Sequence, residues 1–249
     1  MRYVLPCLIG SLFLALWGAR PSFALDEIYS PNTEYKEIGL EYGGSRTVDS
    51  QGSKNNAQAH AFALEAGVLP NLTLEANGSF EKDPDSALHV TTTEIEARYQ
   101  FSDPGENWLD TGFLVAYQHA VRQDDANGIE VKLLLQKDTG FVTHTANIGF
   151  SEQIGPKAVG GPDTVFLWNS RYRYSPAFQP GIELQSDLGQ GQTLGRFQEQ
   201  DHYLGPAAYG KFFIGNGEAL KYQIGYLVGI SRAAAQGAGR LLIEYETHF

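Results

Sequence analysis

The last ten residues, Arg240-Leu241-Leu242-Ile243-Glu244-Tyr245-Glu246-Thr247-His248-Phe249, decide the fold predicted for this chain. Side chains alternate between the two faces of a β-strand. One face would therefore carry Leu241, Ile243, Tyr245, Thr247 and Phe249. The other would carry Arg240, Leu242, Glu244, Glu246 and His248. The stretch is predicted to be a strand with one apolar face, ending in an aromatic residue, and one mostly charged face.

A strand of this kind at the end of a chain resembles the closing strand of a bacterial outer-membrane β-barrel. In those proteins the terminal Phe is part of the signal that the barrel-assembly machinery reads. The resemblance implies that Phe249 plays this part and that the assembly machinery is a partner. The side chains expected to face lipid are Leu241, Ile243, Tyr245 and Phe249. The alternative is a half-buried edge strand of a soluble protein.

Residues 1–24 are predicted to be a cleaved secretory signal peptide. Arg2 supplies the positive start, and Ser22-Phe23-Ala24 fits a small-x-small cleavage site. The apolar run between them is too short for a spanning helix, which needs ~20 apolar residues. The mature chain would consist of a periplasmic N-terminal segment at 25–33 and a barrel at 34–249. The sequence leaves open whether 25–33 enters the barrel as a small plug or stays in the periplasm.

Composition excludes several classes of site. The single cysteine, Cys7, lies in the predicted signal peptide, so the mature chain has no thiol for disulfides or metal ligands. The net charge of −11 argues against nucleic-acid binding, which needs a basic surface. The mean hydropathy of −0.27 gives no strong membrane signal. A transmembrane barrel is expected to show this weakness, because only alternate residues face lipid.

Alternating segments of about ten residues recur along the rest of the chain, as in transmembrane strands. Twelve strands are predicted, at 34–44, 57–68, 72–81, 87–101, 109–120, 128–137, 141–151, 163–175, 181–188, 201–214, 219–230 and 238–249. An even number is usual in single-chain bacterial barrels. The predicted fold is therefore all-β: an antiparallel transmembrane β-barrel of twelve strands.

The connections alternate between short turns and longer polar loops. The turns are expected at 69–71, 102–107, 137–140, 175–180 and 215–218. The loops are expected at 45–56, 81–86, 121–127, 152–162 and 189–200, and the Ala-rich connection at 231–237 fits less well. Aromatic residues gather near the turn ends, at Tyr99, Phe101, Trp108, Tyr172, Tyr174, Tyr245 and Phe249. Such a girdle favours a membrane barrel over a soluble sandwich.

The same alternation assigns an inward, lumen-lining face. Its charged residues are predicted to be Glu37, Glu41, Glu65, Glu75, Glu94, Glu96, Arg98, Asp110, Glu130, Lys132, Arg171, Arg173, Glu183, Asp187, Lys211, Lys221, Arg240, Glu244 and Glu246. Charges inside a membrane protein need water or counter-charges. The first strands supply mostly acids, and most of the bases come from residue 171 onward.

Two interpretations of this lumen remain. In the first, an acidic wall faces a partly basic wall across an open lumen, and the transverse field favours zwitterionic small solutes. Inward glycines would leave water space, at Gly39, Gly112, Gly149, Gly225 and Gly229. In the second, the charges pair and close a narrow tube that side chains can largely fill. Arg171 or Arg173 would then bind Glu183, and Arg240 would bind Glu37 or Glu41.

An enzyme is the least favoured reading. The segment from His144 to Asn147 resembles the His-x-Ser-Asn segment of outer-membrane lipid hydrolases, in which His is the base for a Ser nucleophile. Here Ala146 replaces the serine. Ser151 lies seven residues from His144, roughly 20 Å along a strand, well beyond hydrogen-bond reach. No metal-ligand spacing or nucleotide-binding motif is present, so no catalytic residues, metal or cofactor are expected.

Several segments resemble the outer-membrane proteins named for the MetA pathway of phenol degradation, which are described as transporters. They are LEAGVLPNLTLE (64–75), TANIGF (145–150), YRYSP (172–176), LGPAAYG (204–210), GYLVGI (225–230) and LLIEY (241–245). The resemblance covers most of the mature chain, and the family name implies a link to aromatic-compound catabolism. It carries over no catalytic residues.

The predicted function is an outer-membrane channel for passive passage of small solutes, zwitterionic or aromatic. The first alternative is a closed structural or interaction barrel that presents extracellular loops. A lipid-modifying barrel enzyme is a weaker alternative. The expected partners are outer-membrane lipid, the assembly machinery and an unidentified small solute, with no nucleic acid and no cofactor.

Overall fold

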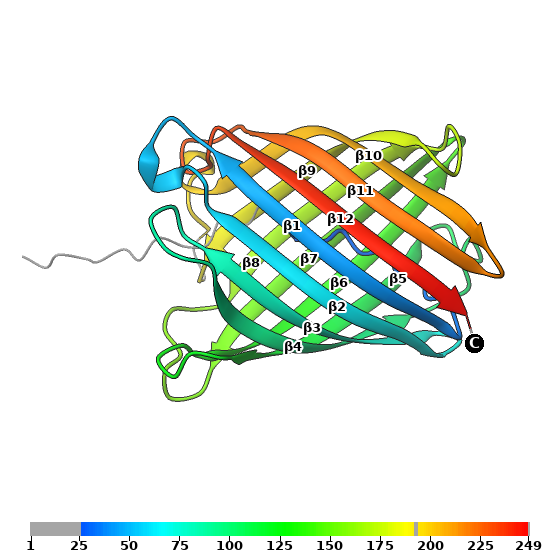
Figure 1. Cartoon of the computed structure of the whole chain (residues 1–249), viewed down its shortest axis with the longest axis horizontal. Helices are drawn as coiled ribbons and strands as arrows, with labels where there is room; N and C mark the ends of the chain where they lie inside the picture. The colour runs from blue at the N-terminus through cyan, green and yellow to red at the C-terminus, as the bar shows by residue number, and fades with distance from the viewer. Residues whose placement is uncertain (1–25, 192–193, 249) are drawn as a thin grey trace, which may run out of the picture.

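The computed structural model describes residues 26–191 and 194–248 (Figure 1). The predicted signal peptide and Phe249 lie outside the described residues. The strands are β1 Glu37–Val48, β2 Gln58–Leu69, β3 Leu72–Lys82, β4 His89–Gln100, β5 Asp110–Ala120, β6 Asn127–Thr139, β7 Val142–Ile154, β8 Asp163–Tyr172, β9 Gln179–Gln190, β10 Asp201–Gly215, β11 Glu218–Gly229 and β12 Gly237–His248. Two short 3-10 helices, η1 Gly52–Lys54 and η2 Phe197–Glu199, lie in loops. Within the described residues, no helix is both long enough and apolar enough to cross a membrane.

The twelve strands close into one antiparallel barrel (Figure 1). Each strand pairs with its neighbours in sequence, and β1 pairs with β12 from Glu37 opposite His248 to Val48 opposite Gly237. Closure leaves no strand edge with unpaired backbone groups, which a barrel in lipid requires. The predicted twelve-stranded antiparallel barrel is confirmed.

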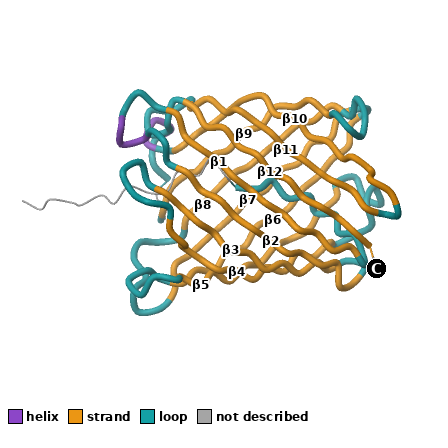
Figure 2. The backbone as a smooth tube through the Cα atoms, in the orientation of Figure 1, coloured by secondary structure: helices purple, strands orange, loops and turns teal. Residues whose placement is uncertain are grey.

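Turns and loops lie at opposite ends of the barrel (Figure 2). At the turn end, Asn216 and Gly217 link β10 to β11 with φ values of 52° and 81°. Positive φ at both central residues is characteristic of the tight type I′ hairpin turn. At the loop end, the Ala-rich connection 230–236 links β11 to β12, so it belongs with the longer loops.

The outer wall is apolar and exposed to the surroundings. The side chains predicted to face outward on β12, Leu241, Ile243 and Tyr245, are each 37% exposed. Larger exposed fractions occur on other strands, such as 61% for Leu40 and 66% for Ile95. An exposed apolar band of this kind matches a protein whose outer wall is covered by lipid.

Aromatic rings cluster at the turn end. The centroids of Tyr99 and Phe113 are 5.8 Å apart, and Phe101 lies 5.6 Å from Phe113. The Lys137 ammonium lies 5.2 Å from the centre of the exposed Trp108 ring. These contacts place rings and a cation where the predicted aromatic girdle would meet a membrane interface.

Candidate functional site

Residues 26–33 of the N-terminal segment lie inside the ring of strands (Figure 2). The Gln185 side chain on β9 donates to the carbonyl of Asp26 at 3.1 Å. The N–H of Thr33 donates to Gln100 Oε1 on β4 at 2.7 Å. The N–H of Lys36 donates to the Gly67 carbonyl at 2.9 Å, just before β1 begins. The sequence leaves open whether this segment enters the barrel or stays in the periplasm. In the structure it enters the barrel.

One side chain holds the middle of this segment by its backbone. The Asn147 amide donates to the carbonyl of Tyr29 and accepts from its N–H, both at 2.8 Å. Asn147 itself is 0% exposed. A carboxamide carries one donor face and one acceptor face, so it can pair with a peptide group as a neighbouring strand would. This clasp satisfies two buried backbone groups that have no strand partner.

The Tyr29 ring fills a slot in the wall. It forms a buried cluster with Leu114, Ala116 and Leu134. The Arg98 guanidinium and the Lys132 ammonium each lie 5.4 Å from the ring centre, within the range of cation–π attraction. A void of about 10 Å³ remains beside the ring. The slot therefore holds Tyr29 by both apolar and electrostatic contacts.

Two glycines on the inner wall make room for the segment. A Cβ placed at Gly112 would lie 3.1 Å from Pro31 Cβ and 2.7 Å from the Tyr99 carbonyl oxygen. A Cβ at Gly67 would collide with the Glu34 carbonyl. Gly112 was expected to leave water space, and the structure instead fills that space with Pro31.

A buried ion pair spans the later strands. Arg240 Nη1 on β12 lies 2.5 Å from Glu183 Oε1 on β9, and both side chains are under 5% exposed. Tyr209 donates to Glu183 Oε2 at 2.9 Å, and Gln185 donates to Glu183 Oε1 at 2.7 Å. The expected pairing of Arg240 with Glu37 or Glu41 is wrong. Arg240 instead reaches across β11 and β10 to Glu183, whose carboxylate also accepts hydrogen bonds from Tyr209 and Gln185.

All but one of the other inward cations have acidic partners. Arg173 binds Asp138 at 2.5 Å rather than the expected Glu183. The remaining pairs are Arg98 with Glu65 at 2.8 Å, Lys132 with Glu130 at 3.2 Å, Lys211 with Glu246 at 2.7 Å, and Lys221 with Glu246 and, at 3.4 Å, with Glu244. Arg171 instead lies 5.9 Å from the Tyr209 ring centre. Within the described residues, Arg171 has no carboxylate within 4 Å.

Four of the predicted inward carboxylates, all on β1, β3 and β4, have no cation that close. Within residues 26–191 and 194–248, no Lys or Arg nitrogen lies within 4 Å of Glu41, Glu75, Glu94 or Glu96. Asn77 Nδ2, which has two hydrogens to donate, lies 3.3, 3.0 and 2.9 Å from oxygens of Glu75, Glu94 and Glu96. The wall formed by β1, β3 and β4 thus carries more carboxyl groups than cations.

The strand register places the predicted inner-wall residues on one side of the sheet. They include Glu37, Glu41, Glu65, Glu75, Glu94, Glu96, Arg98, Asp110, Glu130, Lys132, Arg171, Glu183, Lys211, Lys221, Arg240 and Glu244. Arg173 follows the end of β8 and turns to Asp138. The sequence analysis missed Asn147 and Gln100 as functional residues, because their partners lie in a segment with no strand pattern.

Two groups of side chains offer oxygen-rich ligand sets. Glu37, Glu65 and Glu244 bring one ligand atom each within 4.8 Å of one another, as do Glu34, Glu37 and His248. Carboxylate oxygens suit calcium or magnesium. The Lys221 ammonium lies 3.8 Å from Glu37 and 3.4 Å from Glu244, so a protein cation already supplies positive charge there.

His144 meets a serine on the next strand. Its Nδ1 is hydrogen-bonded to Ser170 Oγ, and the two residues face each other on β7 and β8. The sequence analysis considered only Ser151, on the same strand, and missed this cross-strand partner. Within the described residues, no carboxylate is hydrogen-bonded to His144, so the third member of a hydrolase triad is missing there.

Two loops are tied together at the loop end. Lys54 Nζ donates to the carbonyls of Arg232 and Ala233 at 2.9 and 2.7 Å. The Asp49 carboxylate accepts from the N–H groups of Gln51 and Gln236 at 2.6 and 2.9 Å. These bonds, led by that from Gln51, lower the pKa of Asp49, because they favour its charged form. The Ala-rich connection is thus anchored to the loop between β1 and β2.

Comparison with known proteins supports the fold. No family model and no curated protein matches the chain. The structure is similar to an outer membrane channel from Pseudomonas putida F1, with a TM-score of 0.60 and 14% identity over 90% of this chain and 99% of that one. It is also similar to the KdgM porin (TM-score 0.51, 10% identity, 85% and 99% covered) and to the translocator domain of the autotransporter NalP from Neisseria meningitidis (0.54, 14%, 88% and 90%). At these identities the likeness shows a shared barrel fold. The resemblance to the MetA-pathway family stays a prediction.

Proposed function

We propose that this protein is an outer-membrane channel for passive passage of small solutes, closed at rest by its N-terminal segment. The apolar outer wall and the charged inner wall support a membrane barrel with a polar lumen. Two of the solved structures that share the fold are called a channel and a porin. In this placement the turn end faces the periplasm and the loop end faces outside. Membrane lipid and the assembly machinery are the partners that such a location requires.

The position of the N-terminal segment carries this proposal. Residues 26–33 cross the lumen, and side chains of the wall hold them: Gln185, Asn147 and Gln100. A typical intramolecular hydrogen bond contributes only about 0.5–1.5 kcal/mol net. The segment can therefore leave without breaking any strand pairing, whereas removal of a strand would open the barrel.

The charge of the inner wall suggests the class of solute. The inward bases other than Arg171 lie against carboxylates, whereas Glu41, Glu75, Glu94 and Glu96 lack such partners. The surplus of carboxyl groups over cations should favour solutes with a positive group, alone or as part of a zwitterion. An aromatic solute, which the family resemblance implies, would need to fit beside the same acidic wall.

A closed structural or interaction barrel is the second candidate. The Tyr29 slot and the ion pair between Arg240 and Glu183 fill parts of the lumen, which favours closure. The linked loops around Lys54 would then be the exposed working surface. A lipid-modifying enzyme is less well supported, since the pair formed by His144 and Ser170 has no carboxylate partner among the described residues.

Conductance of two forms of the mature protein in planar bilayers tests the proposal. One form begins at Leu25, and the other begins at Glu34 and so lacks the residues that cross the lumen. The shorter form should give steady single-channel steps, and the longer form should stay closed for most of the recording. Heat-modifiable migration on a gel should show that both forms are folded. A folded short form that never conducts would contradict the channel and favour the closed barrel.

A further inference from the structure

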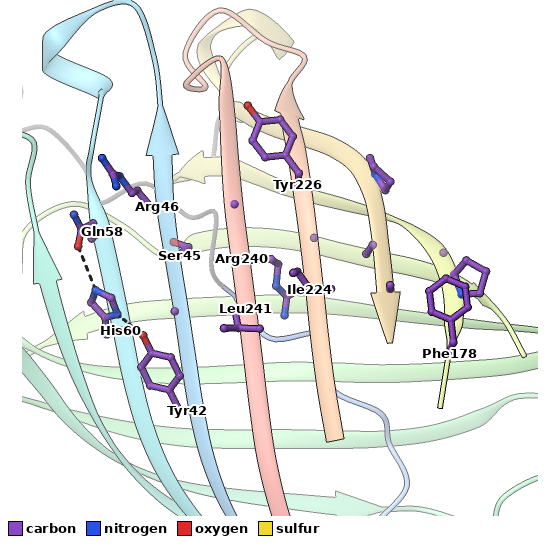
Figure 3. A pocket seen from close by; sticks show the side chains of 18 residues that line it. Tyr42, Ser45, Arg46, Gln58, His60, Phe178, Ile224, Tyr226, Arg240 and Leu241 are labelled. Carbon is purple, nitrogen blue, oxygen red and sulfur yellow. Dashed lines mark hydrogen bonds between the residues drawn. The ribbon is translucent and has the colours of Figure 1, made fainter. Parts of the chain in front are cut away.

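A groove of about 760 Å³ crosses the outer wall of the barrel (Figure 3). It extends from β2 across β1, β12, β11 and β10 to β9. Small residues form much of its floor: Gly44, Gly239, Pro206 and Ala208. Elsewhere on the outer wall, large apolar side chains project at such positions. The groove is therefore a concave strip in an otherwise convex apolar surface.

The strand register gives the groove its direction. Gly44 lies opposite Leu241, Leu241 opposite Ile224, Ile224 opposite Ala208, and Ala208 opposite Pro180. Gly44 is near the loop end of β1, whereas Pro180 is the second residue of β9, at the turn end. Neighbouring strands in a sheet are ~4.8 Å apart, and the groove crosses five such spacings from β2 to β9, so its length is roughly 24 Å. The groove thus runs obliquely across most of the apolar band.

The groove does not open into the lumen between β1, β12 and β11. Pairing of β12 with β1 and with β11 is continuous beneath it. Lining residues that face the lumen, such as Arg240 and Ser45, each lie between two outward residues that also line the groove. The groove is therefore open to the surroundings of the barrel and suited to an occupant from the membrane.

Polar side chains gather at the loop end of the groove (Figure 3). The Tyr42 hydroxyl is 2.9 Å from His60 Nδ1, and His60 Nε2 is 3.4 Å from Gln58 Oε1. Beside them, Arg46 is exposed, and among the described residues no carboxylate lies within 4 Å of its guanidinium. This end offers a free positive charge next to hydrogen-bonding groups.

We propose that the groove binds one membrane lipid with a phosphate headgroup, its acyl chain lying along the floor and its phosphate on Arg46. An acyl chain is a long, narrow apolar group, which matches the shape and composition of the groove. Arg is well suited to phosphate because its planar donors can bind two oxygens at once. Tyr42, His60 and Gln58 lie where the glycerol and ester groups of such a lipid would be. The inference rests on the proposed membrane placement, and it does not depend on whether the lumen conducts.

Native mass spectrometry of the mature protein tests this site. The protein is released from detergent after incubation with equal amounts of phosphatidylglycerol and phosphatidylcholine that have identical acyl chains. The wild type should keep one phosphatidylglycerol in preference to phosphatidylcholine, because only the first has a net negative headgroup. Arg46→Gln should lower this preference about fivefold, the effect of one basic residue near a charged membrane surface. Lys157→Gln, which removes an exposed charge from another loop, should leave it unchanged.

A second pair of variants tests the floor. Gly239→Leu would fill the groove, and a Cβ there meets no atom within 4 Å. Gly78→Leu on β3 is the matched control, since that glycine is equally unhindered and does not line the groove. Gly239→Leu should lose most of the bound lipid of both kinds, and Gly78→Leu should keep it. Gly239→Ala provides a smaller change if heat-modifiable migration shows that the leucine variant is not folded.

Two results would overturn the lipid site. One is equal retention of the two lipids by the wild type, which would remove the role of Arg46. The other is equal lipid retention by folded Gly239 and Gly78 variants, which would remove the role of the groove. Either result leaves the conductance test of the channel untouched, so the two proposals can fail separately.

Discussion

The side chain of Asn147 hydrogen-bonds both backbone groups of Tyr29, a residue 118 positions earlier in the chain. Asn147 belongs to β7, and Tyr29 belongs to a segment that has no strand partner. One amide thus replaces the ladder that would otherwise satisfy this buried peptide. In the proposed channel this contact helps to hold the segment across the lumen, so a substitution at Asn147 is a direct way to weaken closure.

Asn147→Leu should open the channel. The substitution keeps the approximate size of the side chain but removes both bonds to Tyr29. At about 0.5–1.5 kcal/mol each, their loss should shift the balance from closed to open roughly 5- to 150-fold. The measurement is the open fraction in single-channel recordings. Asn169→Leu, a buried inward asparagine on β8, is the control. Equal open fractions for the two variants would contradict the role of the clasp.

Arg171 should influence ion preference more than Arg173. Arg171 has no carboxylate partner within 4 Å among the described residues, whereas Arg173 binds Asp138 at the rim and is 33% exposed. Salt screens charges at an exposed rim, so the removal of such a charge should change ion preference less. In the form that begins at Glu34, Arg171→Ala should raise cation preference, read as a shift of the reversal potential in a salt gradient. A larger shift from Arg173→Ala would show that the rim controls selectivity.

The pair formed by Arg240 and Glu183 should stabilise the barrel as a unit. Arg240→Met leaves a buried carboxylate without its cation, which typically costs about 3–5 kcal/mol. The double variant Arg240→Met with Glu183→Gln should lose less, because no unpaired charge remains. Urea unfolding of protein refolded into vesicles gives the free energies. If the double loss equals the sum of the single losses, the two residues are not coupled.

Lys54 should protect the connection between β11 and β12 from protease. Its ammonium donates to the carbonyls of Arg232 and Ala233. Lys54→Met should release this connection and speed tryptic cleavage after Arg232, followed by mass spectrometry of the fragments. Lys157→Met removes a lysine from a different loop and should leave the rate as in the wild type. An unchanged rate for Lys54→Met would mean that the connection is held by other contacts, such as that between Asp49 and Gln236.

The barrel could be predicted because its signal repeats locally. Strand alternation every two residues places Glu244 inward and Tyr245 outward. Closure follows because a sheet in lipid cannot leave an edge strand unpaired. Boundaries differ by a few residues at most strands; β1, for example, extends to Val48 where 44 was expected. Local alternation cannot say which residues meet across the lumen.

The contacts inside the lumen could not be predicted for that reason. Arg240 pairs with Glu183, three strands away, and not with Glu37 or Glu41 across the seam on β1. The sequence leaves the path of the N-terminal segment open because residues 26–33 show no strand alternation. Gly112 suggested empty space, but Pro31 occupies it. Each of these depends on the curvature of the closed barrel, which no single strand encodes.

A reversible lock on the N-terminal segment tests the central claim most directly. Pro31→Cys and Gly112→Cys would bring two Cβ atoms close enough for a disulfide, and the mature chain has no other cysteine. The pair is made in the Asn147→Leu background, with Gly112→Cys alone as the control for strain near Tyr99. We expect the oxidised protein to stay closed in planar bilayers and to conduct when a reducing agent is added. Equal conductance before and after reduction, with the disulfide confirmed by mass spectrometry, would show that the segment does not close the channel.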